Sequence, residues 1–188
     1  SAQMISYEIA MGMSVVSLFL ISGDLNLSKL VEWQANHGWL VLYQPVSFVI
    51  FLVAAFAETN RLPFDLPESE TELVGGYHTE YSSMKFALFF LGEYANMIAS
   101  SAMMVTLFFG GWSLPFLGKP AESLLGGLIH IGIFIAKMIV LMIVFIWVRW
   151  MLPRFRYDQL MDLGWRRFIP LALANIVATA LGVALFNR

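Results

Sequence analysis

The chain has 188 residues, of which 59% are hydrophobic and 13% are charged, and its formal net charge is −2. Soluble domains contain roughly 45–50% apolar and about 25% charged residues, so this composition favours a membrane protein, and the small net charge excludes a basic surface for nucleic acid. The chain has no cysteine, which excludes disulfides, thiolate zinc sites and cysteine-ligated iron–sulfur clusters.

The first two apolar stretches lie in the N-terminal third of the chain. Residues 5–21 form the first, which Tyr7 and Glu8 interrupt near its start, and residues 41–57 form the second. A helix that crosses a bilayer needs roughly 17–25 mostly apolar residues, so each stretch predicts a membrane span. Pro45 is compatible with the first turn of a helix, where backbone donors lack partners.

Two polar segments separate the first three spans. Residues 24–39 are polar and aromatic, which predicts a connection at the membrane interface. Residues 58–80 carry two prolines, two adjacent glycines and a single base, Arg61, and this composition predicts a loop. The six acids of this loop are Glu58, Asp65, Glu68, Glu70, Glu72 and Glu80.

Three further apolar stretches complete the chain. They comprise residues 83–109, 124–148 and 168–186, and a basic segment, residues 149–167, separates the last two. We therefore predict an all-α integral membrane protein with a single domain, residues 1–188, built as a bundle of about five transmembrane helices. We find no internal repeat, which argues against an inverted-repeat transporter.

The positions of the bases predict which face of the membrane each loop occupies. With five spans, the acidic loop and the basic loop share one face, and that face carries seven bases against three on the other. Lys and Arg are retained on the cytoplasmic side, so both loops are predicted to be cytoplasmic. The seven bases are Arg61, Lys85, Arg149, Arg154, Arg156, Arg166 and Arg167, and the other three are Lys29, Lys119 and Arg188.

Ionisable groups within membrane spans cost about 2.5–3.5 kcal/mol each on insertion scales, so they are candidate functional residues. Glu8 and Glu58 lie near the ends of spans, where reaching to the interface explains them equally well. Glu93 lies ten residues inside its span, roughly 15 Å along the helix, and shares one helix face with Asn96 and Ser100. A carboxyl at that depth suits proton transfer. The alternative is a neutral carboxyl bonded to a neighbouring helix.

Lys137 lies in the middle of the fourth span, with His130 seven residues earlier on the same face. An ammonium at this depth needs an acidic partner, and Glu93 is one candidate. The histidines His37, His78 and His130 lie far apart and lack metal-ligand spacing, so we predict no metal site.

The acids Glu68, Glu70 and Glu72 alternate along the acidic loop between apolar residues that provide packing anchors. Clustered carboxylates titrate as a group, which suits a site that takes up and releases protons. The alternative is an ordinary solvated loop.

Residues 57–97 read AETNRLPFDLPESETELVGGYHTEYSSMKFALFFLGEYANM. Together with ISYE at 5–8, LFFGGW at 107–112 and RFRYDQLMDLGW at 154–165, this segment resembles the quinone-site membrane subunit of proton-pumping NADH:quinone oxidoreductase, respiratory complex I. That subunit is called H in bacteria and 1 in mitochondria. The resemblance covers essentially the whole chain and implies the C-terminal five-helix portion of an eight-helix family fold.

The resemblance implies a subunit of a multisubunit translocase that forms part of the quinone chamber and couples quinone reduction to proton translocation. No complete active site, catalytic residue or bound cofactor is expected in this chain alone. Quinone is the expected substrate, and FMN and iron–sulfur clusters are expected in partner subunits of the peripheral arm. Further expected partners are membrane-arm subunits and the lipid bilayer. The expected location is the bacterial inner membrane, in preference to the mitochondrial inner membrane.

The resemblance also assigns expected roles to individual residues. The residues that match the border of the quinone chamber are Arg61, Phe64, Asp65, Glu68, Glu70 and Glu72. The acids that match a path for charge into the membrane are Glu8, Glu58, Glu80 and Glu93, and the position of Lys137 within a span adds it to this expected proton relay.

Three alternative functions remain open from the sequence. Membrane subunits of energy-converting hydrogenases share part of the same pattern. An ion transporter that uses Glu93 and Lys137 as its ion or substrate site is a second alternative. A scaffold that only anchors partners is the third, and it predicts tolerance of changes at both residues.

Overall fold

The computed structural model describes residues 2–59, 64, 83–114, 124–153 and 156–186. Within these ranges every regular element is a helix. The elements are α1 (Ala2–Ser22), α2 (Leu27–His37), α3 (Leu40–Tyr43), α4 (Pro45–Glu58), α5 (Ser83–Phe108), α6 (Leu124–Met151), α7 (Tyr157–Met161), the π-helical segment η3 (Asp162–Phe168) and α8 (Ile169–Phe186).

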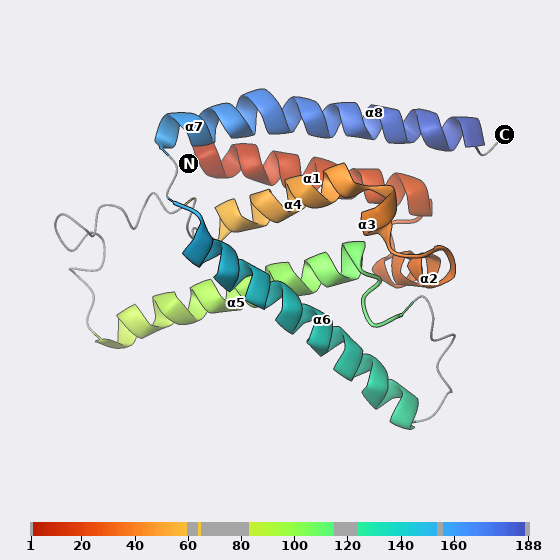
Figure 1. The fold of residues 1–188 in the computed structure, drawn as a ribbon, viewed down its shortest axis with the longest axis horizontal. Coiled ribbons are helices and arrows are strands. Elements are labelled where there is room, and N and C mark those ends of the chain that lie inside the picture. The colour runs from red at the N-terminus through yellow and green to blue at the C-terminus, as the bar shows by residue number, and fades with distance from the viewer. Residues whose placement is uncertain (1, 60–63, 65–82, 115–123, 154–155, 187–188) are drawn as a thin grey trace.

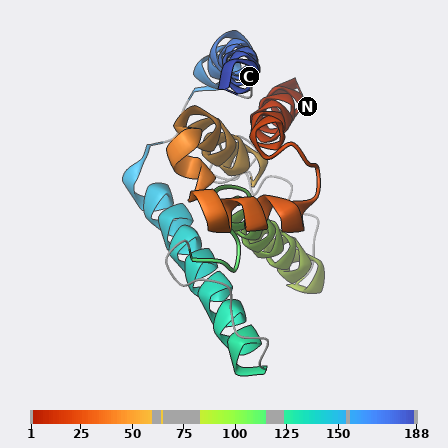
Figure 2. The same ribbon diagram turned by 90° about the vertical axis from the view of Figure 1, so that its right-hand side faces the viewer.

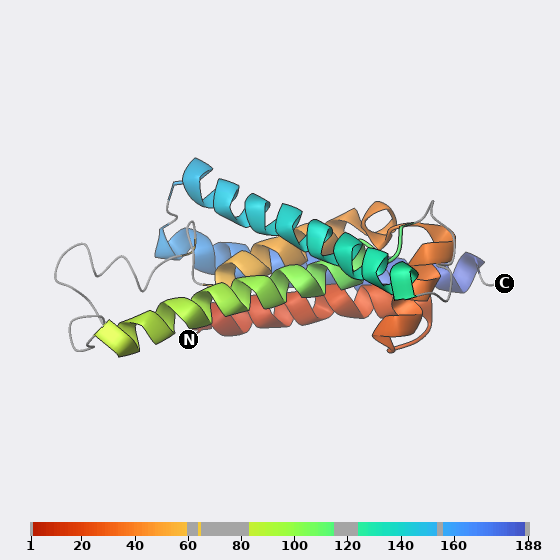
Figure 3. The same cartoon turned by 90° about the horizontal axis from the view of Figure 1, so that it is seen from below.

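Helix α1 lies between α8 and α4 and contacts both of them (Figure 1). Helix α5 lies on the other side of α4, and α6 crosses α5 and then leaves the bundle (Figure 3). The short helix α2 lies across one end of the bundle (Figure 2). The start of α1 and the segment α7–η3 meet at the opposite end.

Three helical stretches are long and apolar enough, by length and composition, to cross a bilayer: Met4–Ser22, Leu124–Met151 and Asp158–Leu185. Helix α4 is a shorter apolar helix of 14 residues, and α5 has 26 residues in the range of the predicted third span. The prediction of an all-α integral membrane protein is confirmed.

The structure differs from the predicted second span, because the helix breaks at Gln44. The backbone of Gln44 has φ −131° and ψ 60°, so α3 ends at Tyr43 and α4 begins at Pro45. Proline disfavours the α conformation in the residue before it and lacks an N–H for the helical ladder. Both effects act at Gln44, so residues 41–57 form parts of two helices.

A helix that the sequence analysis did not expect, α2, occupies most of the polar segment 24–39. It begins at Asn26, whose side chain accepts a 2.9 Å hydrogen bond from the Ser28 amide, and it ends at Gly38, which has φ 103°. Such a cap satisfies one of the four amides that a helix start leaves unpaired. Leu30, Val31 and Gln34 are buried on one face.

The basic segment 149–167, predicted as a loop, is mostly helical. Helix α6 continues to Met151, and a helical stretch from Tyr157 runs through η3 into α8. Its apolar side chains explain the difference, because Leu160 is fully buried and Leu163 and Phe168 pack against the main core. The helix therefore begins eleven residues before the predicted start of the last span at residue 168.

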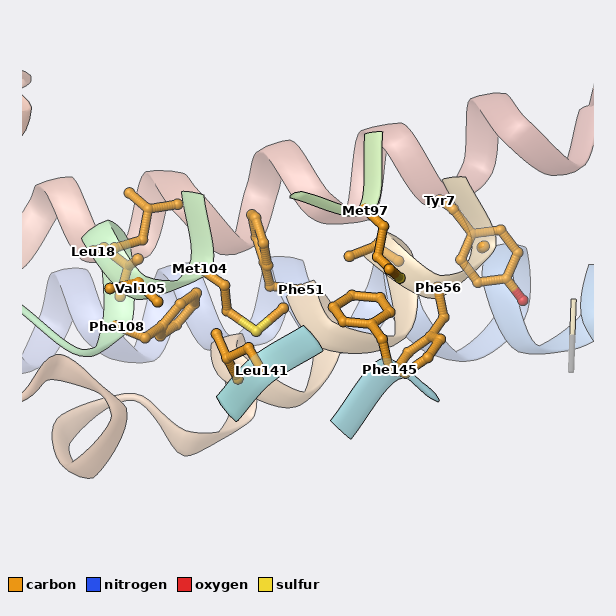
Figure 4. Close-up of a cluster of buried hydrophobic side chains, with 14 of the residues drawn as sticks. Tyr7, Leu18, Phe51, Phe56, Met97, Met104, Val105, Phe108, Leu141 and Phe145 are labelled. Carbon is orange, nitrogen blue, oxygen red and sulfur yellow. The ribbon is translucent and has the colours of Figure 1, made fainter. Parts of the chain in front are cut away.

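The core is a continuous row of apolar side chains between α1, α4, α5 and α6 (Figure 4). The rings of Phe56 and Phe145 lie 4.3 Å apart, which joins α4 to α6. The other labelled members are Tyr7, Leu18, Phe51, Met97, Met104, Val105, Phe108 and Leu141.

A network of uncharged polar side chains joins α1, α4 and α8. The hydroxyl oxygens of Ser17 and Ser47 lie 2.6 Å apart, Gln44 Nε2 donates to Thr179 Oγ1 at 2.7 Å, and Asn175 Nδ2 donates to Gln44 Oε1 at 2.8 Å. Hydrogen bonds of this kind hold membrane helices together, because lipid offers polar groups no other partner.

Candidate functional site

Two acids that are 50 residues apart in sequence line one small pocket at the α7 end of the bundle. Glu8 comes from α1 and Glu58 is the last residue of α4, and Tyr7 lies in the wall between them and the core. The other lining residues are Met4, Met11 and Ala54. Two carboxylates that share a pocket repel each other when both are charged, so their protonation is coupled.

Tyr7 is the buried centre of this end of the bundle and is only 2% exposed. Its hydroxyl donates a 2.9 Å hydrogen bond to the carbonyl oxygen of Leu160 in α7. Its ring meets Phe64 edge to face at 5.5 Å between centroids and Phe168 at 6.1 Å. Edge-to-face contacts of this kind stabilise aromatic pairs beyond the area that they bury. Tyr7 therefore links α1 to α7, η3 and the acidic segment.

Phe64 is the one residue of the predicted quinone chamber that falls in the described part of the chain. It is 3% exposed and packs on Tyr7, which also lines the pocket of Glu8 and Glu58. The other predicted chamber residues, Arg61, Asp65, Glu68, Glu70 and Glu72, lie outside the described residues, and so does the predicted relay acid Glu80.

Glycine at position 164 allows η3 to approach α1 closely. A Cβ atom at Gly164 would lie 2.6 Å from Ser6 Oγ and 3.5 Å from Tyr7 Cε2. The first separation is far below van der Waals contact. A π-helical turn such as η3 is rare and is often found at functional sites.

Glu93 lies on α5, away from this pocket. Glu93, Asn96 and Ser100 are each half-buried, whereas Tyr94, like most of their neighbours, is exposed. The polar face predicted from their spacing therefore lies at the edge of the buried side of α5, where Met97 is 1% exposed.

Lys137 does not pair with Glu93, which corrects the candidate partner from the sequence. Its ammonium donates to the carbonyl oxygens of Phe109, Gly111 and Ser113 at 2.8, 3.0 and 2.6 Å. These carbonyls follow the end of α5 at Phe108, and Glu93 lies 15 residues before that end, roughly 22 Å along the helix. The shared face predicted for His130 is present, since its Nδ1 lies 2.7 Å from the carbonyl oxygen of Trp112.

The bases of the α7–η3 segment are exposed. Arg166 and Arg167 lie 3.5 and 3.8 Å from the carboxylate of Asp162, and both side chains are mostly accessible to solvent. Exposed pairs of this kind contribute little to stability. In the described part of the chain, no group of three or more His, Asp or Glu side chains is placed to hold a metal ion.

Sequence reasoning missed the role of Tyr7 and its partners. It noted Tyr7 only as an interruption of the first span, although a buried tyrosine normally finds an acceptor for its hydroxyl. That rule was a usable signal for the existence of a partner, but the partner is a backbone carbonyl 153 residues away. The sequence carries no mark of that contact.

Comparison with known proteins gives a consistent result over the whole chain. The family described as NADH dehydrogenase matches residues 1–180. NADH-quinone oxidoreductase subunit 8 of Rhodothermus marinus is 54% identical over 100% of this chain and 58% of its own length. The NADH-quinone oxidoreductase subunit of Cytophaga hutchinsonii that is named H 1 is 50% identical over 99% of this chain and 55% of its own length. The one of Flavobacterium psychrophilum that is named H is 51% identical over 100% and 55%. The chain thus spans a little over half the length of these relatives.

Proposed function

Because the chain belongs to the NADH dehydrogenase family, we propose that it forms part of the quinone-site membrane subunit of an NADH-quinone oxidoreductase. In this role it borders the quinone chamber and couples quinone reduction to proton translocation. The observation that carries the proposal is the pocket that Glu8 and Glu58 share, beside the contact between Tyr7 and Phe64.

The acidic loop is the proposed border of the quinone chamber, and its residues Arg61, Phe64, Asp65, Glu68, Glu70 and Glu72 are the proposed lining. The burial of Phe64 against Tyr7 supports this assignment, because it ties the loop to the wall of the acid pair. A change of charge at the headgroup then has a short mechanical and electrostatic route to the bundle.

The proposed proton relay starts at the acid pair. Reduction of a quinone to a quinol consumes two electrons and two protons, and coupled carboxyls suit proton uptake near the headgroup because one can hold a proton while the other is charged. Glu58 and Glu8 are the first proposed members, and Glu80 and Glu93 are proposed to continue the path into the membrane. Lys137 completes the set proposed from sequence, although its carbonyl partners favour a different role, which is argued below.

The remaining parts of the reaction are proposed to lie in other chains. Electrons from NADH would arrive through FMN and iron–sulfur clusters of peripheral-arm subunits, and membrane-arm subunits would carry the proton pumps. The apolar helices indicate a multi-pass membrane protein, and the bacterial inner membrane is its proposed location. This chain contributes to an enzyme as one subunit and supplies no complete active site.

The transporter alternative is not favoured, because it required Glu93 and Lys137 to act together. The ammonium of Lys137 is instead bonded to three backbone carbonyls. The family assignment also disfavours an energy-converting hydrogenase.

The test is a double-mutant cycle at the acid pair, made in the full-length subunit within its complex. Glu8→Gln and Glu58→Gln keep the size and hydrogen bonding of each side chain but remove its titration. We expect each to lower NADH:quinone turnover and proton translocation together, at least about tenfold, as loss of a general acid–base group does. The double variant should be little worse than either single variant, because residues that act as one unit are not additive.

Glu32→Gln is the matched control, since Glu32 is an exposed acid on α2. It should leave turnover and translocation unchanged. Wild-type turnover with normal translocation in both Glu8→Gln and Glu58→Gln would remove the acid pair from the proposed mechanism.

A further inference from the structure

The end of α5 lies beside the middle of α6, and this creates a problem for its backbone. Helix α5 ends at Phe108, and a turn with positive φ at Gly110 and Gly111 follows, at 71° and 54°. The side chain that meets this turn, Lys137, is 13 residues from Leu124 at the start of α6, roughly 20 Å along an apolar helix of 28 residues. A helix leaves its last four carbonyls unpaired, and at membrane depth no water is present to satisfy them.

Side chains from two other helices satisfy these carbonyls. Gln34 of α2 donates from Nε2 to two carbonyls near the end of α5, and Lys137 and His130 of α6 serve the turn that follows it. A carbonyl oxygen only accepts, so Nδ1 of His130 carries the hydrogen in its contact. The carbonyls that are paired in this way belong to Thr106, Leu107, Phe109, Gly111, Trp112 and Ser113.

Lys137 is the only charged member of this group, and its donors are fully used. An ammonium has three N–H donors and no acceptor, and three carbonyl oxygens receive them at 2.6 to 3.0 Å. The C-terminal end of a helix carries a partial negative charge, which favours a cation there. The ring of Trp39 adds a cation–π contact at 5.7 Å from its centroid to Nζ.

These partners are unsuited to proton transfer. Backbone carbonyls accept hydrogen bonds but do not take up protons in the accessible pH range, so a proton that leaves Lys137 has no acceptor among the groups bonded to it. Among the residues that the structure describes, no carboxylate lies within ion-pair distance of its ammonium.

We propose that Lys137 is a fixed cation that closes the end of α5 within the membrane, and that it positions α5 against α6 without exchanging protons. This inference does not depend on the reaction that the complex carries out. It removes Lys137 from the proton path proposed from the sequence and assigns it a positioning role through the backbone of residues 109–113.

The experiment separates charge from titration at residue 137. Lys137→Arg keeps a cation that does not deprotonate in proteins, and Lys137→Gln removes the charge. Lys29→Gln is the matched control, since Lys29 is exposed and paired with Asp24 outside the spans. Each variant is made in the full-length subunit and isolated in its complex, and the thermal midpoint and proton translocation are measured in parallel.

We expect Lys137→Gln to lower the thermal midpoint by roughly 5 °C or more, because it leaves charge-assisted hydrogen bonds unmade. Lys29→Gln should leave it unchanged. Lys137→Arg should keep translocation and recover most of the midpoint. A Lys137→Gln variant with the wild-type midpoint and no translocation overturns the proposal, and so does a Lys137→Arg variant with the wild-type midpoint and no translocation.

A second measurement covers the case in which arginine does not fit among the three carbonyls. Lys137→Ala leaves space for a small cation, and n-propylammonium should raise its midpoint, whereas n-propanol should not. If neither arginine nor n-propylammonium raises the midpoint above that of Lys137→Gln, the proposal is wrong. Absence of NADH:quinone activity in the wild-type complex would refute the proposed function alone, because the midpoint comparison is independent of it.

Discussion

Replacement of Gly164 by alanine tests whether the close packing of η3 on α1 maintains the candidate site. The added Cβ would lie 2.6 Å from Ser6 Oγ, 3.3 Å from Ser6 Cβ and 3.5 Å from Tyr7 Cε2. Carbon atoms in contact prefer about 3.5–4.0 Å. Rotation of the Ser6 hydroxyl relieves only the first contact, and Ser6 is completely buried. The helix backbones must therefore separate by several tenths of an ångström.

The magnitude follows from the cost of overpacking. An extra methyl group in a packed core typically costs about 1–3 kcal/mol, and 1 kcal/mol lowers the midpoint of a domain of this size by roughly 2–4 °C. We expect Gly164→Ala to lower the thermal midpoint by roughly 2–12 °C, reduced by the better helix propensity of alanine, up to about 1 kcal/mol. The same separation should weaken the hydrogen bond from Tyr7 to Leu160, so quinone turnover should fall as well.

The assay is thermal denaturation of the complex that carries the full-length subunit, together with its NADH:quinone activity. Gly182→Ala is the control, because a Cβ at Gly182 in α8 meets no atom within 4 Å. It should leave the midpoint unchanged or raise it. Ser6→Ala in the Gly164→Ala background removes the shortest contact and should recover part of the loss. Equal midpoints for Gly164→Ala and Gly182→Ala would refute the packing argument.

Two further predictions concern the same end of the bundle. Tyr7→Phe removes the donor to the buried Leu160 carbonyl, so the free energy of unfolding should fall by about 1–3 kcal/mol, and an unchanged melting curve would contradict the role of this bond. Joint replacement of Glu68, Glu70 and Glu72 by Gln should weaken the apparent quinone affinity or slow quinone reduction in proteoliposomes, whereas wild-type affinity and rate would identify the acidic segment as a solvated loop.

The apolar pattern predicted where the long helices lie, because a span must satisfy its own backbone over a length that the bilayer sets. It did not predict the break at Gln44. The effect of Pro45 was judged only as that of a residue in a first helical turn, and its effect on the residue before it was not considered. It also missed α2, whose composition is polar and whose helix is stabilised by the Asn26 cap and by one buried face.

Contacts between helices were the less predictable part. Spacing along α6 correctly placed His130 and Lys137 on one face, because residues seven apart share a face of any helix. The same spacing carries no information on which helix end meets that face. Glu93 was a reasonable candidate partner by charge, but backbone carbonyls carry no residue-type signal, and the structure pairs Lys137 with three of them.

The two kinds of ionisable group in this bundle have partners of different chemistry, and this difference limits where a proton path can run. Glu8 and Glu58 share a pocket, so each has a neighbour that itself gains and loses protons. Lys137 has only carbonyl partners in the described part of the chain, and these cannot exchange a proton with it. A relay needs a donor and an acceptor within hydrogen-bond reach or one water apart. We therefore expect the path from the acid pair to continue along α4 and α5 toward Glu93, and α6 to act as the fixed element against which α5 is held.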